Sequence, residues 1–144
     1  MNFAATKLLF CWSCLCLVAS APVRAECPVG TVIVKGRVEH VARNATVRVQ
    51  LVYSKDEHQE SAEATLDRDR FSIPVEFLTQ SRKPVLLGTL REKCDRRPTE
   101  VIVTLSAGDQ RFDQLSLDLT REFKKVDVNT YAARSEVVLH GAQP

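Results

Sequence analysis

Apolar and polar residues alternate through most of the chain after its first 25 residues. In Thr31–His40 three valines and a glycine share one face, and charged residues occupy the other. The segment 47–53 repeats this pattern after a turn at 42–44. Val-rich alternation with a period of two residues predicts half-buried strands, and the short turn predicts that these two strands form a hairpin.

Further strand-like segments follow along the chain, at 62–66, 71–77, 85–90, 101–105, 115–119 and 135–140. Pro74 falls on the polar face of one of them and removes a backbone donor, which predicts a strand at a sheet edge. A single helical turn is expected in Thr120–Lys125, capped by Asp118 or Thr120. Seven or eight short strands without a substantial helix predict an all-β fold, a single two-sheet antiparallel β-sandwich.

The first 25 residues have the organisation of a secretory signal peptide. Lys7 precedes an apolar run from Leu8 to Ala21, and small residues then lead to a cleavage site after Ala25, with cleavage after Ala21 as the alternative. The run is too short to span a bilayer comfortably. We therefore expect a secreted, extracellular protein with a signal peptide at 1–25, a single domain at 26–144 and no membrane association after cleavage.

Removal of the leader leaves two of the five cysteines, Cys27 and Cys94. In an oxidising secretory pathway such a pair is expected to form one disulfide, and two cysteines are too few for a zinc site. Asn44 begins the sequon Asn-Ala-Thr in an expected turn, so in a eukaryotic source it is a candidate N-glycosylation site and the protein a candidate glycoprotein. The sequence leaves the source and the glycan occupancy open.

The mature chain is close to electrically neutral. Two of the 20 basic residues, Lys7 and Arg24, lie in the leader, which leaves 18 basic residues against 18 acidic ones. Nucleic acid is therefore not an expected partner, because it requires a concentrated basic surface. The sole Trp also lies in the leader, which disfavours sugar stacking and leaves Tyr131 as the one candidate platform.

Three short motifs resemble a known group of secreted sandwiches. They are Val-Lys-Gly-Arg-Val at 34–38, Val-Arg-Val-Gln-Leu at 47–51 and Thr-x-Asp-x-Asp-x-Phe-x-Ile at 65–73. Their order is similar to that in transthyretin-like and carboxypeptidase regulatory-like domains, and Cys94 stands before a later strand as in secreted transthyretin-like proteins. Arg70 departs from the turn glycine usual before the Phe. The resemblance implies a β-sandwich, and transthyretins carry small ligands between subunits.

Enzymatic chemistry is not expected, and neither is a cofactor. The chain has no nucleophile motif and no glycine-rich phosphate loop. His40 and His140 would approach each other if the first and last strands paired, which would permit a histidine-centred metal or acid-base site. We expect instead that these histidines and His58 are surface residues.

The expected function is binding to an extracellular or host protein, as a secreted effector or a signalling-type factor. The expected contact surfaces are Ser54–Glu60 and Arg91–Arg97, with Arg91, Lys93, Arg96 and Arg97 as the candidate partner-binding residues. The interleaved acidic residues favour a solvated connection over a docking loop in this segment. The alternative function is a carrier of a small apolar ligand in an inter-sheet or dimer-interface pocket. The oligomeric state does not follow from the sequence.

Overall fold

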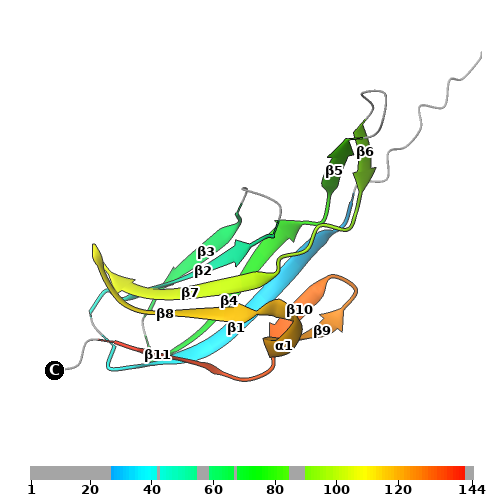
Figure 1. The fold of residues 1–144 in the computed structure, drawn as a ribbon. Helices are drawn as coiled ribbons and strands as arrows, with labels where there is room; N and C mark the ends of the chain where they lie inside the picture. The colour runs from blue at the N-terminus through cyan, green and yellow to red at the C-terminus, as the bar shows by residue number, and fades with distance from the viewer. Residues whose placement is uncertain (1–26, 42, 55–58, 67, 85–89, 142–144) are drawn as a thin grey trace, which may run out of the picture.

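The computed structural model describes residues 27–41, 43–54, 59–66, 68–84 and 90–141, and in 81–84 and 90–93 it describes the backbone alone. The expected signal peptide and the apolar segment 85–89 lie outside the described residues. The described chain forms two packed sheets and a separate two-stranded ribbon (Figure 1). The expected all-β sandwich is therefore confirmed.

One sheet has five strands and the other has four. The five-stranded sheet contains β1 (Val29–Glu39), β4 (Arg70–Leu78), β9 (Phe123–Asp127), β10 (Thr130–Ala133) and β11 (Val137–His140). The four-stranded sheet contains, in spatial order, β3 (Ser61–Thr65), β2 (Thr46–Val52), β7 (Glu100–Ala107) and β8 (Gln110–Asp118). The ribbon consists of β5 (Ser81–Pro84) and β6 (Leu90–Lys93).

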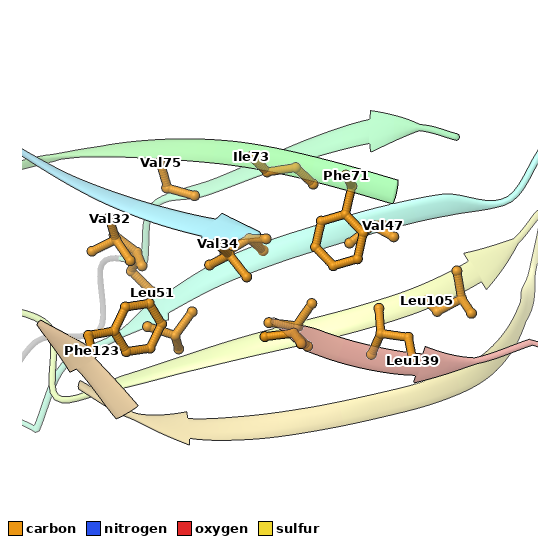
Figure 2. Close-up of a cluster of buried hydrophobic side chains, with 14 of the residues drawn as sticks. Val32, Val34, Val47, Leu51, Phe71, Ile73, Val75, Leu105, Phe123 and Leu139 are labelled. Carbon is orange, nitrogen blue, oxygen red and sulfur yellow. The ribbon is translucent and has the colours of Figure 1, made fainter. Parts of the chain in front are cut away.

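The hydrophobic core fills the space between the two sheets. The inward positions of β1, β2, β4 and β7 are almost fully buried, as the alternating sequence pattern predicts. Figure 2 shows side chains from both sheets meeting in this layer, among them Val34, Leu51, Leu105 and Leu139. Burial of these apolar faces is the main force that holds the sheets together.

Two glycine–phenylalanine pairs hold β1 close against β4. Gly30 lies opposite Phe77 and Gly36 lies opposite Phe71 in the antiparallel register. A Cβ atom at either glycine would overlap the aromatic ring of its partner. The rings therefore occupy the space that the missing side chains leave, and a shift in register would lose both contacts.

The expected hairpin between the first two strands is wrong. β1 and β2 belong to different sheets, and β1 pairs with β4 whereas β2 pairs with β3 and β7. His40 and Asn44, both with a φ of 60°, lie in the connection that crosses between the sheets. Two strands with one apolar face each can bury these faces across the sandwich as well as side by side, so alternation does not distinguish the two arrangements.

The five-stranded sheet is mixed, in contrast to the expected antiparallel one. β10 and β11 both pair in parallel with β1, the first along Thr31–Ile33 and the second along Gly36–Glu39. β9 and β10 form an antiparallel hairpin, which sets the direction of β10. The chain then continues in the same direction into β11, so the two short strands occupy successive parts of one edge of β1.

The structure adds strands that the sequence pattern did not predict, so the described chain has eleven strands rather than seven or eight. Helix α1 spans Leu119–Glu122 with Asp118 as its N-cap, as expected, but Phe123–Asp127 is strand β9. β4 pairs with β1 alone in the described sheets, which confirms the edge position predicted from Pro74. Within the described ranges, no helix has the length and apolar character needed to cross a membrane.

Candidate functional site

The β5–β6 ribbon projects from the end of the sandwich. Figure 1 shows it beyond the ends of the other strands, near the start of β1. Its two strands pair with each other over four residue pairs, and neither pairs with another strand of the described chain. The outer backbone edges of β5 and β6 therefore pair with no strand of the two sheets in the described chain.

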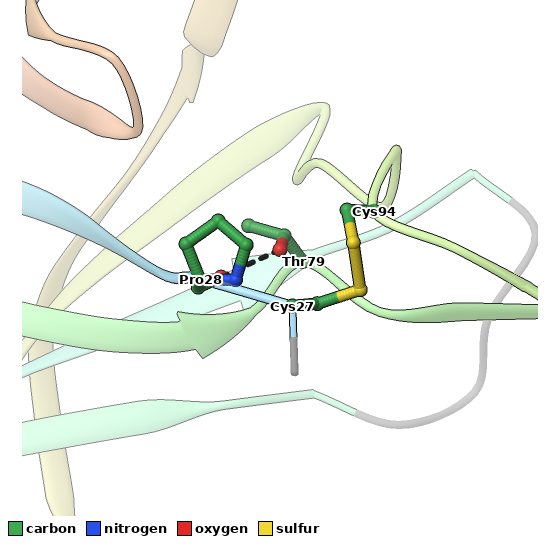
Figure 3. Close-up of a disulfide and its surroundings, with 4 residues drawn as sticks. All are labelled: Cys27, Pro28, Thr79 and Cys94. Carbon is green, nitrogen blue, oxygen red and sulfur yellow. Dashed lines mark hydrogen bonds between the residues drawn. A yellow bond between two sulfur atoms is a disulfide. The ribbon is translucent and has the colours of Figure 1, made fainter. Parts of the chain in front are cut away.

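A disulfide attaches the end of the ribbon to the start of β1. Cys27 and Cys94 are bonded, with their Cα atoms 5.3 Å apart across 67 residues of sequence. Figure 3 shows the bond between Cys27 and Cys94. Cys94 directly follows Lys93, the last residue of β6. The expected disulfide is confirmed, and the structure adds that it fixes the base of a projecting element.

Thr79 closes the other side of this base. This residue is 3 % exposed, and its hydroxyl donates to the Pro28 carbonyl oxygen at 2.5 Å (Figure 3). The Arg96 amide donates to the Thr79 carbonyl oxygen at 2.9 Å, which joins the chain entering the ribbon to the chain leaving it. The segment before β5 and the segment after β6 are thus bonded to each other and to the residues that precede β1.

Arg96 lies under this base, in contact with three segments. Its Nη1 donates to Glu60 Oε1 at 2.6 Å and to the Leu78 carbonyl oxygen at 3.0 Å. Its Nη2 donates to Glu60 Oε2 at 3.3 Å, and its guanidinium carbon lies 3.7 Å from the centroid of the Tyr53 ring. This two-point contact with a carboxylate, combined with stacking on an aromatic ring, uses the planar geometry particular to arginine.

Burial and charge in this cluster shift two pKa values in opposite directions. Burial of Glu60 raises its pKa, but the hydrogen bond and the charge of Arg96 outweigh this effect and hold the carboxyl below its usual value. Burial raises the pKa of the Tyr53 phenol well above its usual value, and the adjacent Glu60 carboxylate adds to this shift. At neutral pH the cluster therefore contains a charged Arg–Glu pair and a neutral phenol.

Of the four candidate partner-binding residues, Arg96 and Arg97 have described side chains, and these two differ in exposure. Arg96 is turned inward, with 9 % of its side chain exposed, so its expected place in an exposed basic docking loop needs correction. Arg97 is exposed. Arg91 and Lys93 lie in strand β6 rather than in a loop. The alternating charges around Cys94 did not indicate this, because the contact between Arg96 and Glu60 spans 36 residues.

The other expected contact surface, Ser54–Glu60, is described only at residues 54, 59 and 60. Residues 55–58, including His58, lie outside the described residues. Glu60 forms part of the buried cluster, and Tyr53 is 7 % exposed, as its place in the inward alternation predicts. The Tyr53 hydroxyl oxygen is buried and makes no hydrogen bond to the described part of the chain. Tyr131, the candidate sugar platform, is 9 % exposed in the core and cannot present its ring to a sugar.

The first and last strands do pair, as the histidine hypothesis required. Glu39 lies opposite His140, with 3.4 Å between Oε2 and Nδ1, and the His140 amide donates to Asp113 Oδ2 at 2.8 Å. No three His, Cys, Asp or Glu residues in the described ranges are placed to hold a metal ion together. Since Asp113 belongs to β8, these contacts attach the last strand to both sheets.

A polar hollow of about 520 Å³ lies beside α1, lined by Thr99, Glu100, Ser116, Asp118, Arg121 and Glu122. Its carboxylates already accept hydrogen bonds from the chain. Asp118 caps α1, Glu122 accepts from the Asp118 amide at 2.6 Å, and Glu100 accepts from the Ser116 hydroxyl. The hollow is thus not the apolar pocket that a carrier of small apolar ligands requires.

No protein-family model matches the chain, and searches of curated proteins and of solved structures find no match either. The transthyretin-like resemblance therefore remains a prediction from the three sequence motifs.

Proposed function

We propose that the chain is a small secreted, non-enzymatic binding protein that engages an extracellular or host protein through the β5–β6 ribbon. The observation that carries this proposal is the ribbon itself, which projects from the sandwich on a base held by a disulfide, by Thr79 and by Arg96. A projecting element with an anchored base loses less conformational freedom on binding than a free loop does.

The predicted leader and the disulfide support an extracellular location, since disulfides persist in oxidising compartments. Asn44 is exposed in the turn that follows β1. β1 has eleven residues and starts beside the ribbon base, so a glycan at Asn44 would lie about 35 Å from that base. Glycosylation there would leave the ribbon accessible to a partner.

The carrier alternative receives no support from the described core, where side chains of both sheets occupy the inter-sheet space. Whether the protein acts as an effector or as a signalling factor depends on which protein it binds, so identification of the partner tests this part of the proposal.

The test is capture of a partner from extracellular fluid by the oxidised mature chain, residues 26–144. The matched variant replaces residues 82–92 with Asn-Gly, because Ser81 and Lys93 lie opposite each other and a two-residue turn can join them. This variant retains the disulfide and both sheets. Capture of a distinct protein by the intact chain and its loss with the shortened ribbon would support the proposal. Equal capture by both proteins would contradict it.

A further inference from the structure

Strand β3 forms one side of the four-stranded sheet, and its outer edge pairs with no strand of the described chain (Figure 1). The Leu51 amide donates to the Glu60 carbonyl oxygen at 2.8 Å, so these two residues form a hydrogen-bonded pair of the β2–β3 ladder. Such pairs alternate with non-bonded pairs along an antiparallel ladder. Ser61, Glu63 and Thr65 therefore belong to non-bonded pairs, and their amides and carbonyl oxygens point away from β2.

The other outer strands of the two sheets each have a feature that hinders the addition of a strand. In β4, Pro74 removes an amide from the outer edge. In β8 the amides of Gln114 and Asp118 already donate to carboxylates, at 2.8 and 2.6 Å, and in β11 the His140 amide does so at 2.8 Å. β9 contains two exposed lysines, a common protection of an edge. The three outward amides of β3 have no hydrogen-bond partner in the described ranges, so this edge is open.

The inner face of β3 leaves the apolar layer of the sandwich half-covered. Ala62 and Ala64 lie opposite Val49 and Val47 and pack against the core, but the alanines are half-buried whereas the valines are fully buried. A strand added to this edge would place alternate side chains beside the two alanines. Apolar residues at these positions would extend the core layer and leave water.

Glu63 determines which segment fits the edge. It is exposed on the outer face opposite Arg48 and makes no ion pair with a described side chain. A residue directly opposite Glu63 on an added strand is favoured when it is basic and disfavoured when it is acidic. Two copies of this chain that paired all three outward residues of β3 antiparallel would place Glu63 opposite Glu63. The edge therefore disfavours its own copy and favours a different protein with a basic residue at this position.

We propose that β3 is a binding edge on which an extended segment of another protein adds as an antiparallel fifth strand of the four-stranded sheet. The segment has Lys or Arg opposite Glu63 and apolar residues on either side of it, beside Ala62 and Ala64. Main-chain hydrogen bonds to the three outward residues provide affinity, and the alternate side chains select the segment. This inference goes beyond the proposed function, because it concerns a strand of the sandwich and does not involve the ribbon.

Contacts at both ends hold β3 in place before a segment arrives. Glu60 directly precedes the strand, and its carboxylate is bonded to Arg96. Beyond the other end, the Leu66 amide donates to the Ala45 carbonyl oxygen at 2.8 Å. These contacts reduce the conformational entropy that is lost on strand addition.

The test uses fluorescence anisotropy with the oxidised mature chain and the labelled peptide Val-Thr-Val-Lys-Val-Thr-Val. In the proposed register its Lys lies opposite Glu63, and the flanking valines lie beside the two alanines. One N-methylated form blocks the amides of Thr and Lys, which would face β3. A control form blocks three valine amides, which would face away from β3. We expect the first form to bind at least roughly tenfold more weakly than the control form. Equal binding of the two forms would overturn strand addition.

An exchange of charge tests the position of the segment. Glu63→Lys should weaken binding of the Lys peptide roughly tenfold and strengthen binding of a peptide with Glu in place of Lys by a similar factor. Binding of the Glu peptide also shows that this variant is folded. Glu76→Lys is the matched control, because Glu76 is an exposed residue of the edge strand β4 and the change in net charge is the same. We expect the control variant to bind the Lys peptide within about twofold of the unmodified chain. An equal effect of the two variants would overturn the assignment to β3.

Sedimentation equilibrium of the chain with and without the Lys peptide tests the competing occupant. A dimer of the unmodified chain that dissociates when the peptide is added would overturn the inference in favour of a second copy. The proposed function fails separately, because the variant with the shortened ribbon retains β3. Capture of an extracellular protein that survives this shortening would contradict the role of the ribbon alone. Failure of the Lys peptide to bind the unmodified chain would overturn only the present inference.

Discussion

Replacement of Arg96 by alanine is expected to destabilise the fold more than any other single change at an arginine of the ribbon base. The substitution breaks an ion pair with 2.6 Å between Arg96 Nη1 and Glu60 Oε1, whose side chains are 9 % and 16 % exposed. It also removes the donor to the Leu78 carbonyl oxygen and the stacking on Tyr53. The loss therefore combines an unpaired carboxylate, an unpaired carbonyl and lost packing.

Breaking a buried ion pair by removing one partner costs about 3–5 kcal/mol. Because Glu60 keeps some contact with water, we expect Arg96→Ala to lower the free energy of unfolding by about 2–3 kcal/mol. Urea denaturation at neutral pH measures this value. Arg97→Ala is the matched control, since Arg97 is exposed and its loss should change stability by less than about 0.5 kcal/mol.

A double-mutant cycle with Glu60→Ala isolates the pair itself, and we expect a coupling energy of about 1–3 kcal/mol. The coupling should also depend on pH in a defined direction. The pKa of Glu60 is lowered in the folded state, so the pair stabilises fully when the pH is above the pKa that this carboxyl has in the unfolded chain. This stabilisation is lost as the pH falls through the folded-state pKa. A coupling near zero at neutral pH, or one unchanged in acid, would refute the reasoning.

Three further predictions concern the disulfide, the glycine–phenylalanine pairs and the ribbon base. Replacement of Cys27 and Cys94 by serine should lower the free energy of unfolding by about 4 kcal/mol, because the bond closes a loop across 67 residues. Calorimetry of the variant and of the unmodified chain measures this loss, and a much smaller loss would contradict the prediction. Gly36→Ala should cost about 1–3 kcal/mol in urea denaturation because its Cβ would overlap the Phe71 ring, and an unchanged midpoint would contradict this packing. Thr79→Val should lower the free energy of unfolding by about 1–2 kcal/mol and speed hydrogen exchange of the Arg96 amide. Unchanged slow exchange of this amide in the variant would show that the Thr79 hydroxyl does not hold the base together.

The alternation of apolar residues was sufficient to predict which side chains enter the core. Val32, Val34, Phe77 and Leu105 are buried because a strand has two faces and each residue can take only one of them. The pattern failed where burial is incomplete. Phe123–Asp127 has one buried residue followed by four exposed ones, so β9 has no alternating signal and its sequence favoured a helical turn.

Arg96 illustrates the limit for the candidate site. Its neighbours in sequence are charged, and the next residue, Arg97, is an exposed arginine. Its inward position depends on Glu60 and Tyr53, which come from the segment after β2 and meet it only after folding. Local sequence therefore could not distinguish the residue that supports the ribbon from the residue that faces solvent.

The all-β class, the buried face of the main strands, the single disulfide and the edge position of Pro74 could all be predicted from the order of the residues. Each follows from a local rule: two-residue periodicity, a lone pair of cysteines or the missing proline amide. Tertiary structure alone decided that β1 and β2 separate into different sheets, that β10 and β11 run parallel to β1, and that Ser81–Lys93 leaves the sandwich as a ribbon on a buried base. These outcomes depend on pairing between distant segments, for which many registers satisfy the same local pattern and only the packed whole selects one.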